Sequence, residues 1–326
     1  MYIEDLKFSL WLDFIERDYL DKEFIELIDK GIINGATSNP AIFKNAILNS
    51  PAYKNQIEEL EDKSAKEKYE ALAIFDISKA ADILKPLHDK GDDGYVSIEV
   101  DPFLCDDSEA TISEGKRLFE TIGKKNVMIK VPATEAGYKA MEALTSLGIP
   151  VNATLIFKKS QAIACANAFK KGNASYGQNI DTVISIFVSR VDRALDGVLK
   201  EKGVEVALSG IYNTADIYNM IEEMKVPACR ALFASTGVKD DSLPPYYYVE
   251  QLLAYNSVNT APVDTIKAYY KDGSKEAVLP ISSDIIDAHF AKLKEAGVDL
   301  EAELDKQIED GLVSFQDAFK DILDSL

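Results

Sequence analysis

Short apolar segments alternate with longer segments of helical spacing along most of this chain. The short segments are rich in β-branched residues, and the longer ones place apolar residues three and four positions apart. This alternation is typical of parallel βα units. We count eight short segments and predict an α/β fold, a single (β/α)8 barrel (TIM barrel). The predicted strands are residues 8–12, 35–37, 96–100, 127–131, 150–156, 183–188, 231–234 and 257–260.

The chain is longer than such a barrel requires. A (β/α)8 barrel typically takes about 250 residues, and this chain has 326. The surplus lies in a charged, alanine-rich segment at 53–90 and in the segments 281–295 and 298–326, which have helical spacing. We predict additional helices after strand 2 and a C-terminal helical segment at about 263–326, within one domain, 1–326. The alternative, an open doubly wound sheet, usually carries a glycine-rich loop after its first strand, and residues 13–17 hold no glycine.

Composition and charge exclude several classes of protein. The chain holds 36 Lys and Arg against 55 Asp and Glu, a net charge of −19. Nucleic acids bind basic surfaces, so we expect no nucleic-acid partner. The apolar runs are too short to cross a bilayer, and the first residues lack the pattern of a signal peptide. Cys105, Cys165 and Cys229 lie far apart without a zinc or disulfide pattern, so we expect a cytoplasmic protein with no membrane contact.

One predicted strand contains a lysine among apolar residues. Residues 127–131 read VMIKV, so strand alternation places Lys130 opposite to Ile129 and Val131. If the helices cover the apolar face, Lys130 points into the barrel. Burial there lowers the pKa of an ammonium group and frees the amine to form a Schiff base with a carbonyl compound. Two alternatives are a lysine in a buried ion pair and a strand shifted by one residue, with Lys130 facing solvent.

Other strands also deliver polar side chains. Glu99 lies on the strand before Lys130, Asn152 and Thr154 share a face of the strand after it, and the first strand ends at Asp13. Polar groups gathered inside a barrel would destabilise a purely structural core. Taken together, these residues predict a site at the C-terminal ends of the strands. Taken singly, each carboxylate is also compatible with a solvated strand end.

Two other kinds of site combine a lysine with carboxylates. A divalent metal would need Asp13, Glu99 and Asp101 together, but the two histidines lie far apart in helical segments, and Asp92 and Asp93 are expected in an exposed turn. A pyridoxal phosphate enzyme would use a lysine, but the glycine-rich phosphate cup is missing from the sequence. We therefore expect neither a metal nor an organic cofactor.

Several segments around these residues resemble the motifs of transaldolases. Residues 35–43 (GATSNPAIF) resemble the T-S/T-N-P segment of that family, and residues 127–134 (VMIKVPAT) resemble its Schiff-base lysine strand. The combination is specific, and the matches run in the family's order from Leu10 to about Pro262. The further matches are 97–101 (SIEVD), 148–157 (GIPVNATLIF), 184–192 (ISIFVSRVD), 234–239 (ASTGVK) and 257–262 (SVNTAP).

The resemblance implies a transferase of the pentose phosphate pathway (pentose shunt) with a class I Schiff-base mechanism and no cofactor. Transaldolases move a dihydroxyacetone unit from sedoheptulose 7-phosphate to glyceraldehyde 3-phosphate. Carried over by motif, Lys130 is the nucleophile, and Asp13 exchanges a proton with the hydroxyl next to the bond that breaks. Glu99 acts through a water held with Thr154. The implied substrate-binding residues are Asn39 and Asn152 at the three-carbon fragment, and Ser185, Arg190 and Ser235 at the phosphate end.

One position departs from the family pattern. Many transaldolases carry a phosphate-binding arginine two residues after the serine that corresponds to Ser235, and Gly237 stands there in this chain. Lys239 and Arg230 are the neighbouring cations. We favour Lys239 as the replacement because the loop after the seventh strand of a barrel is a common phosphate position. The alternative is a solvated loop lysine.

Two other functions remain open at this stage. A fructose 6-phosphate aldolase-like enzyme would release free dihydroxyacetone, but such aldolases are shorter and lack the extra helices. A catalytically silent binding barrel is the other alternative. The C-terminal helices either cover the site or form the contact of a possible homodimer.

Overall fold

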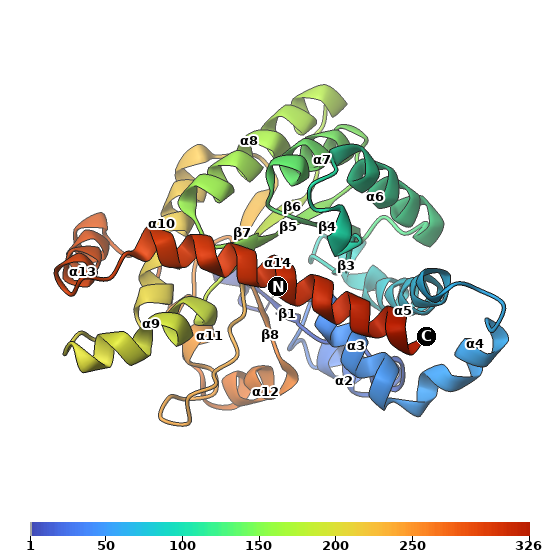
Figure 1. Cartoon of the computed structure of the whole chain (residues 1–326), viewed down its shortest axis with the longest axis horizontal. Helices are drawn as coiled ribbons and strands as arrows, with labels where there is room; N and C mark the ends of the chain where they lie inside the picture. Colours follow the sequence, from blue (N-terminus) through green and yellow to red (C-terminus); the bar gives the residue numbers. More distant parts are fainter. Residues whose placement is uncertain (1) are drawn as a thin grey trace.

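Eight parallel strands form a closed barrel in the computed structural model, which describes residues 2–326 (Figure 1). The strands pair in chain order, and the last closes the ring against the first. The predicted (β/α)8 architecture is confirmed, and each predicted strand is present with bounds shifted by one or two residues. The strands are β1 (Ser9–Leu12), β2 (Gly35–Ala36), β3 (Tyr95–Glu99), β4 (Val127–Pro132), β5 (Val151–Ile156), β6 (Thr182–Phe187), β7 (Cys229–Ala234) and β8 (Val258–Ala261).

The helices surround this barrel, and the predicted additional ones are present after β2 and at the C-terminus (Figure 1). The helices are α1 (Arg17–Leu20), α2 (Glu23–Asp29), α3 (Pro40–Asn49), α4 (Lys54–Glu59), α5 (Ala65–His88), α6 (Ser108–Ile122), α7 (Glu135–Ser146), α8 (Lys159–Tyr176), α9 (Ser189–Glu201), α10 (Ser209–Met224), α11 (Tyr247–Gln251), α12 (Val263–Asp272), α13 (Ser283–Glu295) and α14 (Leu300–Ser325). Short 3₁₀ turns occur at Glu4–Leu6, Pro51–Tyr53 and Pro102–Leu104.

The segment 53–90, predicted as helix throughout, is interrupted between α4 and α5. Ser64 begins α5 with a capping box, in which its hydroxyl accepts from the backbone N–H of Glu67 and its own N–H donates to the Glu67 carboxylate. This reciprocal pair starts a new helix. The serine followed three positions later by glutamate was the sequence signal for the break.

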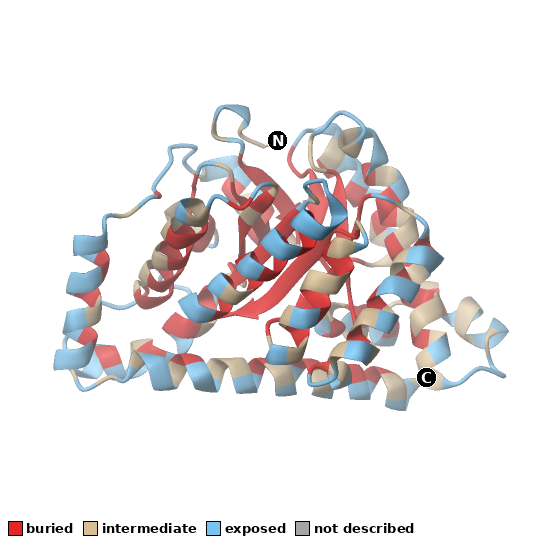
Figure 2. Ribbon diagram, turned by 90° about the horizontal axis from the view of Figure 1, so that it is seen from above, coloured by how far each residue is buried: buried red, intermediate tan, exposed pale blue. Residues whose placement is uncertain are grey.

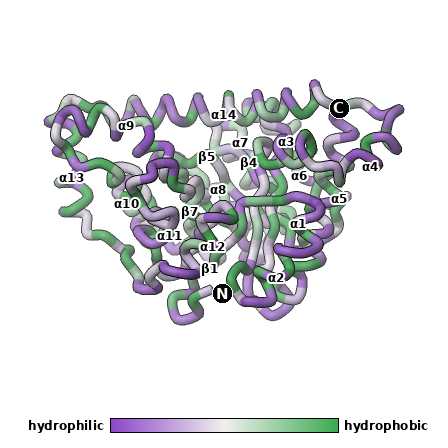
Figure 3. The backbone as a smooth tube through the Cα atoms, turned by 90° about the horizontal axis from the view of Figure 1, so that it is seen from below, coloured by the Kyte–Doolittle hydropathy of each residue, from purple (hydrophilic) through white to green (hydrophobic). Residues whose placement is uncertain are grey.

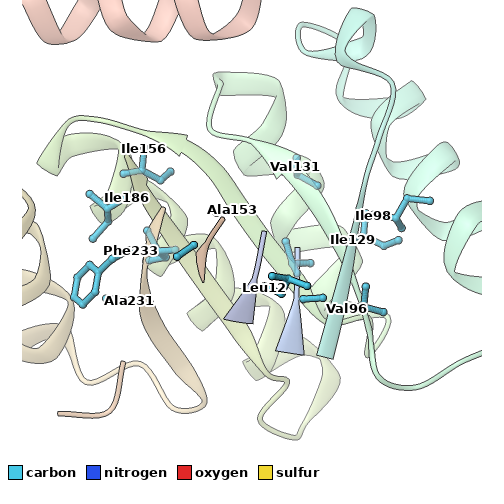
Figure 4. Close-up of a cluster of buried hydrophobic side chains, with 14 of the residues drawn as sticks. Leu12, Val96, Ile98, Ile129, Val131, Ala153, Ile156, Ile186, Ala231 and Phe233 are labelled. Carbon is cyan, nitrogen blue, oxygen red and sulfur yellow. The ribbon is translucent and has the colours of Figure 1, made fainter. Parts of the chain in front are cut away.

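The outward-facing side chains of the strands are apolar and pack beneath the helices. Ile98 of β3, Ile129 and Val131 of β4 and Ile186 of β6 belong to one buried cluster (Figure 4). Side chains alternate along a strand, so the residues between them point into the barrel. Five large inward side chains fill its N-terminal half: Trp11, Met128, Val183, Leu232 and Val258. Two residues further along four of the same strands, the inward positions become polar: Asp13, Lys130, Ser185 and Thr260.

A contact of three side chains closes the N-terminal end of the barrel. The indole Nε1 of Trp11 donates to Asp93 Oδ2 (3.0 Å), and Arg230 Nη2 lies 2.8 Å from Asp93 Oδ1. Gly35 makes room for the indole, because a Cβ at this position would lie 2.5 Å from Trp11 Nε1. The prediction that Asp93 is an exposed turn residue is wrong. Its side chain is only 7% exposed because the carboxylate pairs with Arg230 beneath the barrel.

The C-terminal helix α14 lies across the opposite end of the barrel from the N-terminus (Figures 1 and 3). Buried and exposed residues alternate along it with helical spacing, so one face packs on the barrel and the other faces solvent (Figure 2). None of the helices within residues 2–326 combines the length and the apolar character needed to cross a membrane.

Candidate active site

A small cavity of about 140 Å³ lies at the C-terminal ends of the strands, beneath α14. Side chains from most of the strands and from α14 line it. The structure brings eight of the ten predicted site residues to this cavity: Asp13, Asn39, Lys130, Asn152, Thr154, Ser185, Arg190 and Ser235. Of the other two, Glu99 lies directly behind Lys130, and Lys239 lies elsewhere.

Lys130 points into the barrel and is 5% exposed. Its Nζ lies 3.4 Å from Glu99 Oε2 and donates to the backbone carbonyl of Ser38 at 3.1 Å. The alternative in which Lys130 faces solvent is therefore wrong. The lysine is both a partner in a buried ion pair and a wall of the cavity, so its amine is within reach of a bound molecule.

The Glu99 carboxyl is almost completely buried beside this amine. Burial raises its pKa to about 7, and the negative charge of Asp13 raises it as well, whereas Lys130 lowers it. Both carboxylate oxygens lack a hydrogen-bond partner within the described chain, and so does the buried hydroxyl of Thr154. Buried polar atoms usually have such partners. A carboxyl with a pKa near 7 can exchange protons readily at neutral pH.

Asp13 lies at the end of β1, and its carboxylate Oδ1 accepts a hydrogen bond from Thr37 Oγ1 at 2.7 Å. Burial raises the pKa of Asp13, and Lys130 and the Thr37 hydroxyl lower it. Thr37 Oγ1 also lies 2.6 Å from Thr260 Oγ1. These contacts fix the orientation of the carboxylate toward the cavity.

Asn152 is held by hydroxyls on the strands to either side. Its Nδ2 donates to Ser97 Oγ (3.0 Å), and its Oδ1 accepts from Ser185 Oγ (2.6 Å). Beyond it, β5 bulges: three residues from Ala153 to Ile156 span the length that two residues of β6 cover. The bulge puts Leu155 in a left-handed conformation (φ 59°). An extra residue of this kind changes the direction of the side chains that follow, so Thr154 and Leu155 both face the barrel mouth.

Asn39 reaches the cavity from the start of α3. It caps that helix, with its Oδ1 accepting from the backbone N–H of Ile42 at 3.0 Å. The cap satisfies one N–H of the helix end and holds the side chain in one orientation. The two N–H groups of its amide are the donors that it can present to a ligand.

A cation and two serines form the far wall of the cavity. Arg190 lies in the first turn of α9, where burial and the neighbouring Arg193 lower its pKa. Its guanidinium forms no ion pair with any carboxylate of residues 2–326. Ser235, in a left-handed conformation (φ 56°), lies 3.1 Å from Ser189 between their hydroxyl oxygens. A half-buried guanidinium without a carboxylate partner favours an anionic ligand group.

The two proposed replacements for the family arginine are not at the cavity. Arg230 is at the N-terminal end of the barrel in its ion pair with Asp93, so it cannot reach a ligand at the other end. Lys239 is exposed on the loop after β7 and is not among the residues that line the cavity. Its contact with phosphate stays a prediction.

The carboxylates that a metal site would need each have another side chain as partner: Lys130 for Glu99, Thr37 for Asp13 and Lys66 for Asp101. Asp101 Oδ2 pairs with Lys66 at 2.6 Å, and Asp101 does not line the cavity that holds Asp13 and Lys130. Residues 2–326 contain no group of three or more His, Cys, Asp or Glu side chains placed to hold a metal ion.

Sequence reasoning missed several residues that line the cavity: Thr37, Phe187, Thr260, Ser314 and Phe315. Thr37 stands in the TSNP segment and Phe187 and Thr260 in other matched segments, so these had a signal. Ser314 and Phe315 come from α14, and only the helical spacing of apolar residues marked this segment.

The fold and the site together define a barrel protein that presents a lysine amine and the carboxylate of Asp13 to one cavity, with the Glu99 carboxylate beside the amine. A family model described as Transaldolase/Fructose-6-phosphate aldolase matches residues 10–326. The transaldolase of Campylobacter jejuni (strain RM1221) is 48% identical over 98% of this chain and 99% of its own. That of Helicobacter pylori (strain ATCC 700392 / 26695) is 44% identical over the same shares. The chain belongs to the transaldolase/fructose-6-phosphate aldolase family.

Proposed function

We propose that the protein is a transaldolase of the pentose phosphate pathway, acting in the cytoplasm. It transfers a dihydroxyacetone unit from sedoheptulose 7-phosphate to glyceraldehyde 3-phosphate through a Schiff base on Lys130. The observation that carries this proposal is the Lys130 amine at the cavity wall, 3.4 Å from the Glu99 carboxylate. The nearly full-length similarity to proteins named transaldolase supports it.

In the first half of the reaction, the Lys130 amine adds to the ketone carbon of the donor, and the resulting carbinolamine loses water to form an iminium. Glu99 moves the protons of these steps through a water shared with Thr154. The unpartnered oxygens of both side chains support this role. Asp13 then takes the proton of the hydroxyl next to the bond that breaks. The bond electrons flow into the iminium, and erythrose 4-phosphate leaves.

The second half reverses these steps with a new aldehyde. The enamine carbon attacks the carbonyl carbon of glyceraldehyde 3-phosphate, and Asp13 gives a proton to the former carbonyl oxygen, which becomes the new hydroxyl. Hydrolysis of the iminium releases fructose 6-phosphate and regenerates the amine. The protein serves this chemistry by holding the electron-rich intermediate away from bulk water.

The remaining side chains bind and orient the sugar phosphates. Asn39 and Asn152 hydrogen-bond the hydroxyls of the three-carbon fragment without adding charge beside the iminium. Ser185 holds Asn152 in place and faces the phosphate end together with Arg190 and Ser235. The half-buried guanidinium of Arg190, which forms no ion pair within residues 2–326, supports this placement of the phosphate.

The second candidate is an enzyme that releases free dihydroxyacetone, because the matching family model covers aldolases as well. A product assay separates the two. The protein is incubated with sedoheptulose 7-phosphate, with or without glyceraldehyde 3-phosphate, and the products are quantified by mass spectrometry. We expect fructose 6-phosphate and erythrose 4-phosphate only when the acceptor is present. Dihydroxyacetone at an equal rate without acceptor would favour the aldolase, and no turnover would contradict both.

A further inference from the structure

The helix α14 is a fixed cover over the cavity. Lys158 Nζ pairs with Glu301 and Asp305 at its N-terminal end, at 2.8 Å in both cases. Lys68 Nζ donates to the carbonyl of Leu326 just beyond its C-terminal end (2.6 Å). The helix is therefore anchored on both sides of the barrel mouth (Figure 1).

The middle of α14 lies directly on the rim of the barrel. A Cβ at Gly311 would lie 3.0 Å from Leu155 Cδ2 and 3.6 Å from Arg190 Nη1. The bulge in β5 turns Leu155 toward the helix, and the absence of a side chain at Gly311 lets the helix backbone come close. The next turn consequently reaches the cavity with Ser314 and Phe315.

Phe315 lies over the amine of Lys130. The centroid of its ring is 5.7 Å from Nζ, and the residue is 3% exposed. The carboxylate of Asp13 and the amides of Asn39 and Asn152 come from β-strand ends and from the start of α3, whereas α14 contributes Ser314 and Phe315. A carbon atom bonded to Nζ and directed toward α14 would lie closer to this ring than Nζ itself does.

We infer that Phe315 contacts the three-carbon fragment on Lys130 and shields it from water, and thereby sets how often the fragment is transferred and how often it is released. The inference rests on the proposed function. It adds a residue from the last helix that determines the outcome of the reaction.

Release requires one water per fragment. Water gives a proton to the enamine carbon, which forms the iminium and leaves hydroxide. The hydroxide adds to the iminium carbon, and the carbon–nitrogen bond then breaks as the proton of this new hydroxyl passes to the amine nitrogen. The products are dihydroxyacetone and free Lys130. An apolar ring over the fragment opposes the first of these steps because it keeps water from the enamine carbon.

The test uses the full-length protein with fructose 6-phosphate as donor and erythrose 4-phosphate as acceptor. The ratio of dihydroxyacetone released to sedoheptulose 7-phosphate formed is measured for wild type, Phe315→Ala and Phe315→Leu. We expect Phe315→Ala to raise this ratio about tenfold or more, and Phe315→Leu, which keeps an apolar cover, to raise it by less than about threefold. An unchanged ratio in Phe315→Ala would overturn the inference.

Two further variants separate shielding from general loosening of the helix. Phe319 lies one turn further on, packs on Tyr69 with ring centroids 4.9 Å apart, and does not line the cavity. Phe319→Ala removes the same side chain from α14, and a rise equal to that of Phe315→Ala would overturn the inference. Val313 is 54% exposed, and Val313→Ala should leave the ratio unchanged.

If Phe315→Ala does not fold, Phe315→Val takes its place in the test. This variant must then raise the ratio of dihydroxyacetone to sedoheptulose 7-phosphate, by less than is expected for Phe315→Ala. Failure of the proposed function has a different signature. In that case the wild-type protein forms neither sedoheptulose 7-phosphate nor an adduct on Lys130. If wild type transfers the fragment and the Phe315 variants leave the ratio unchanged, the inference about Phe315 is refuted and the proposed function stands.

Discussion

Glu99 and Lys130 are paired residues on neighbouring strands, β3 and β4, and their charged groups are 3.4 Å apart inside the barrel. Strand register therefore determines which acid lies beside the amine. In the proposed mechanism the pair must hold a single proton, so that the amine can become free while the carboxyl carries the proton. The protonation state of Glu99 consequently controls the nucleophile.

This pairing predicts the pH dependence of activity. The pKa of Glu99 is raised to about 7, mainly by burial. Below that pH, Glu99 is protonated, and the ammonium of Lys130 then has no acceptor for its proton. We expect kcat/KM to fall about tenfold per pH unit below pH 7. Glu99→Gln should lower kcat by about 10²–10⁴-fold and abolish this limb of the profile. A limb that persists in Glu99→Gln would assign it to another group.

Asp192 predicts a pH dependence of stability. Its carboxyl is buried in the first turn of α9 and accepts from the backbone N–H of Gly210 at 2.7 Å. Burial raises its pKa from 3.8 to about 7. Between these values the folded protein keeps a proton that the unfolded chain releases, so the free energy of unfolding falls as pH rises. A rise of this size corresponds to a loss of at most about 4 kcal/mol in the free energy of unfolding across this pH range.

The test compares Asp192→Asn with wild type by urea denaturation at pH 5 and pH 8. The variant should gain stability relative to wild type at pH 8. Asp240→Asn is the control, because Asp240 is exposed and backbone and side-chain hydrogen bonds from Ser242 lower its pKa. Its difference from wild type should be the same at both pH values. An Asp192→Asn difference that does not change with pH would contradict the prediction.

Arg190 should account for much of the recognition of phosphate. Charge-assisted hydrogen bonds contribute about 1.5–3 kcal/mol each, so Arg190→Ala should raise the KM for fructose 6-phosphate by roughly 10- to 100-fold. Steady-state kinetics with fructose 6-phosphate and with unphosphorylated fructose check this. Equal effects on both sugars would show that Arg190 does not bind the phosphate.

Lys239→Ala belongs in the same kinetic series. If Lys239 replaces the family arginine, the variant should bind phosphorylated substrates far more weakly than wild type does, and its binding of dihydroxyacetone should change little. Equal effects on both would exclude Lys239 from the phosphate site. Because Lys239 is exposed and Arg190 lines the cavity, we expect the larger effect on phosphate binding from Arg190→Ala.

Gly35 should be intolerant of a side chain because it lies against Trp11. The Cβ of Gly35→Ala would come 2.5 Å from the indole Nε1, and overpacking of this kind costs about 1–3 kcal/mol. Thermal unfolding should show a clear loss. Gly197→Ala is the control, since an added Cβ on this exposed helical residue meets nothing within 4 Å. It should stabilise α9 by about 0.5–1 kcal/mol. Equal melting temperatures in the two variants would contradict the packing argument.

The sequence predicted the features that depend on local spacing. Strand alternation put Lys130 inside the barrel, and family motifs identified the polar residues at the strand ends. Contacts between distant segments could not be predicted in this way. The Asp93–Arg230 ion pair joins residues 137 positions apart, and no local pattern distinguishes such an aspartate from one in an exposed turn. The spacing of apolar residues predicted a helix over residues 298–326, but only the path of α14 across the barrel shows that Phe315 covers Lys130.

The proposed mechanism depends above all on covalent binding of a ketose to Lys130. Its most direct test is reduction with borohydride in the presence of fructose 6-phosphate, followed by peptide mass mapping of wild type and Lys130→Ala. We expect a reduced three-carbon or hexose phosphate adduct on the peptide that contains Lys130, and no adduct in the variant. An unlabelled wild-type protein that still catalyses transfer, or an adduct that persists in Lys130→Ala, would contradict it.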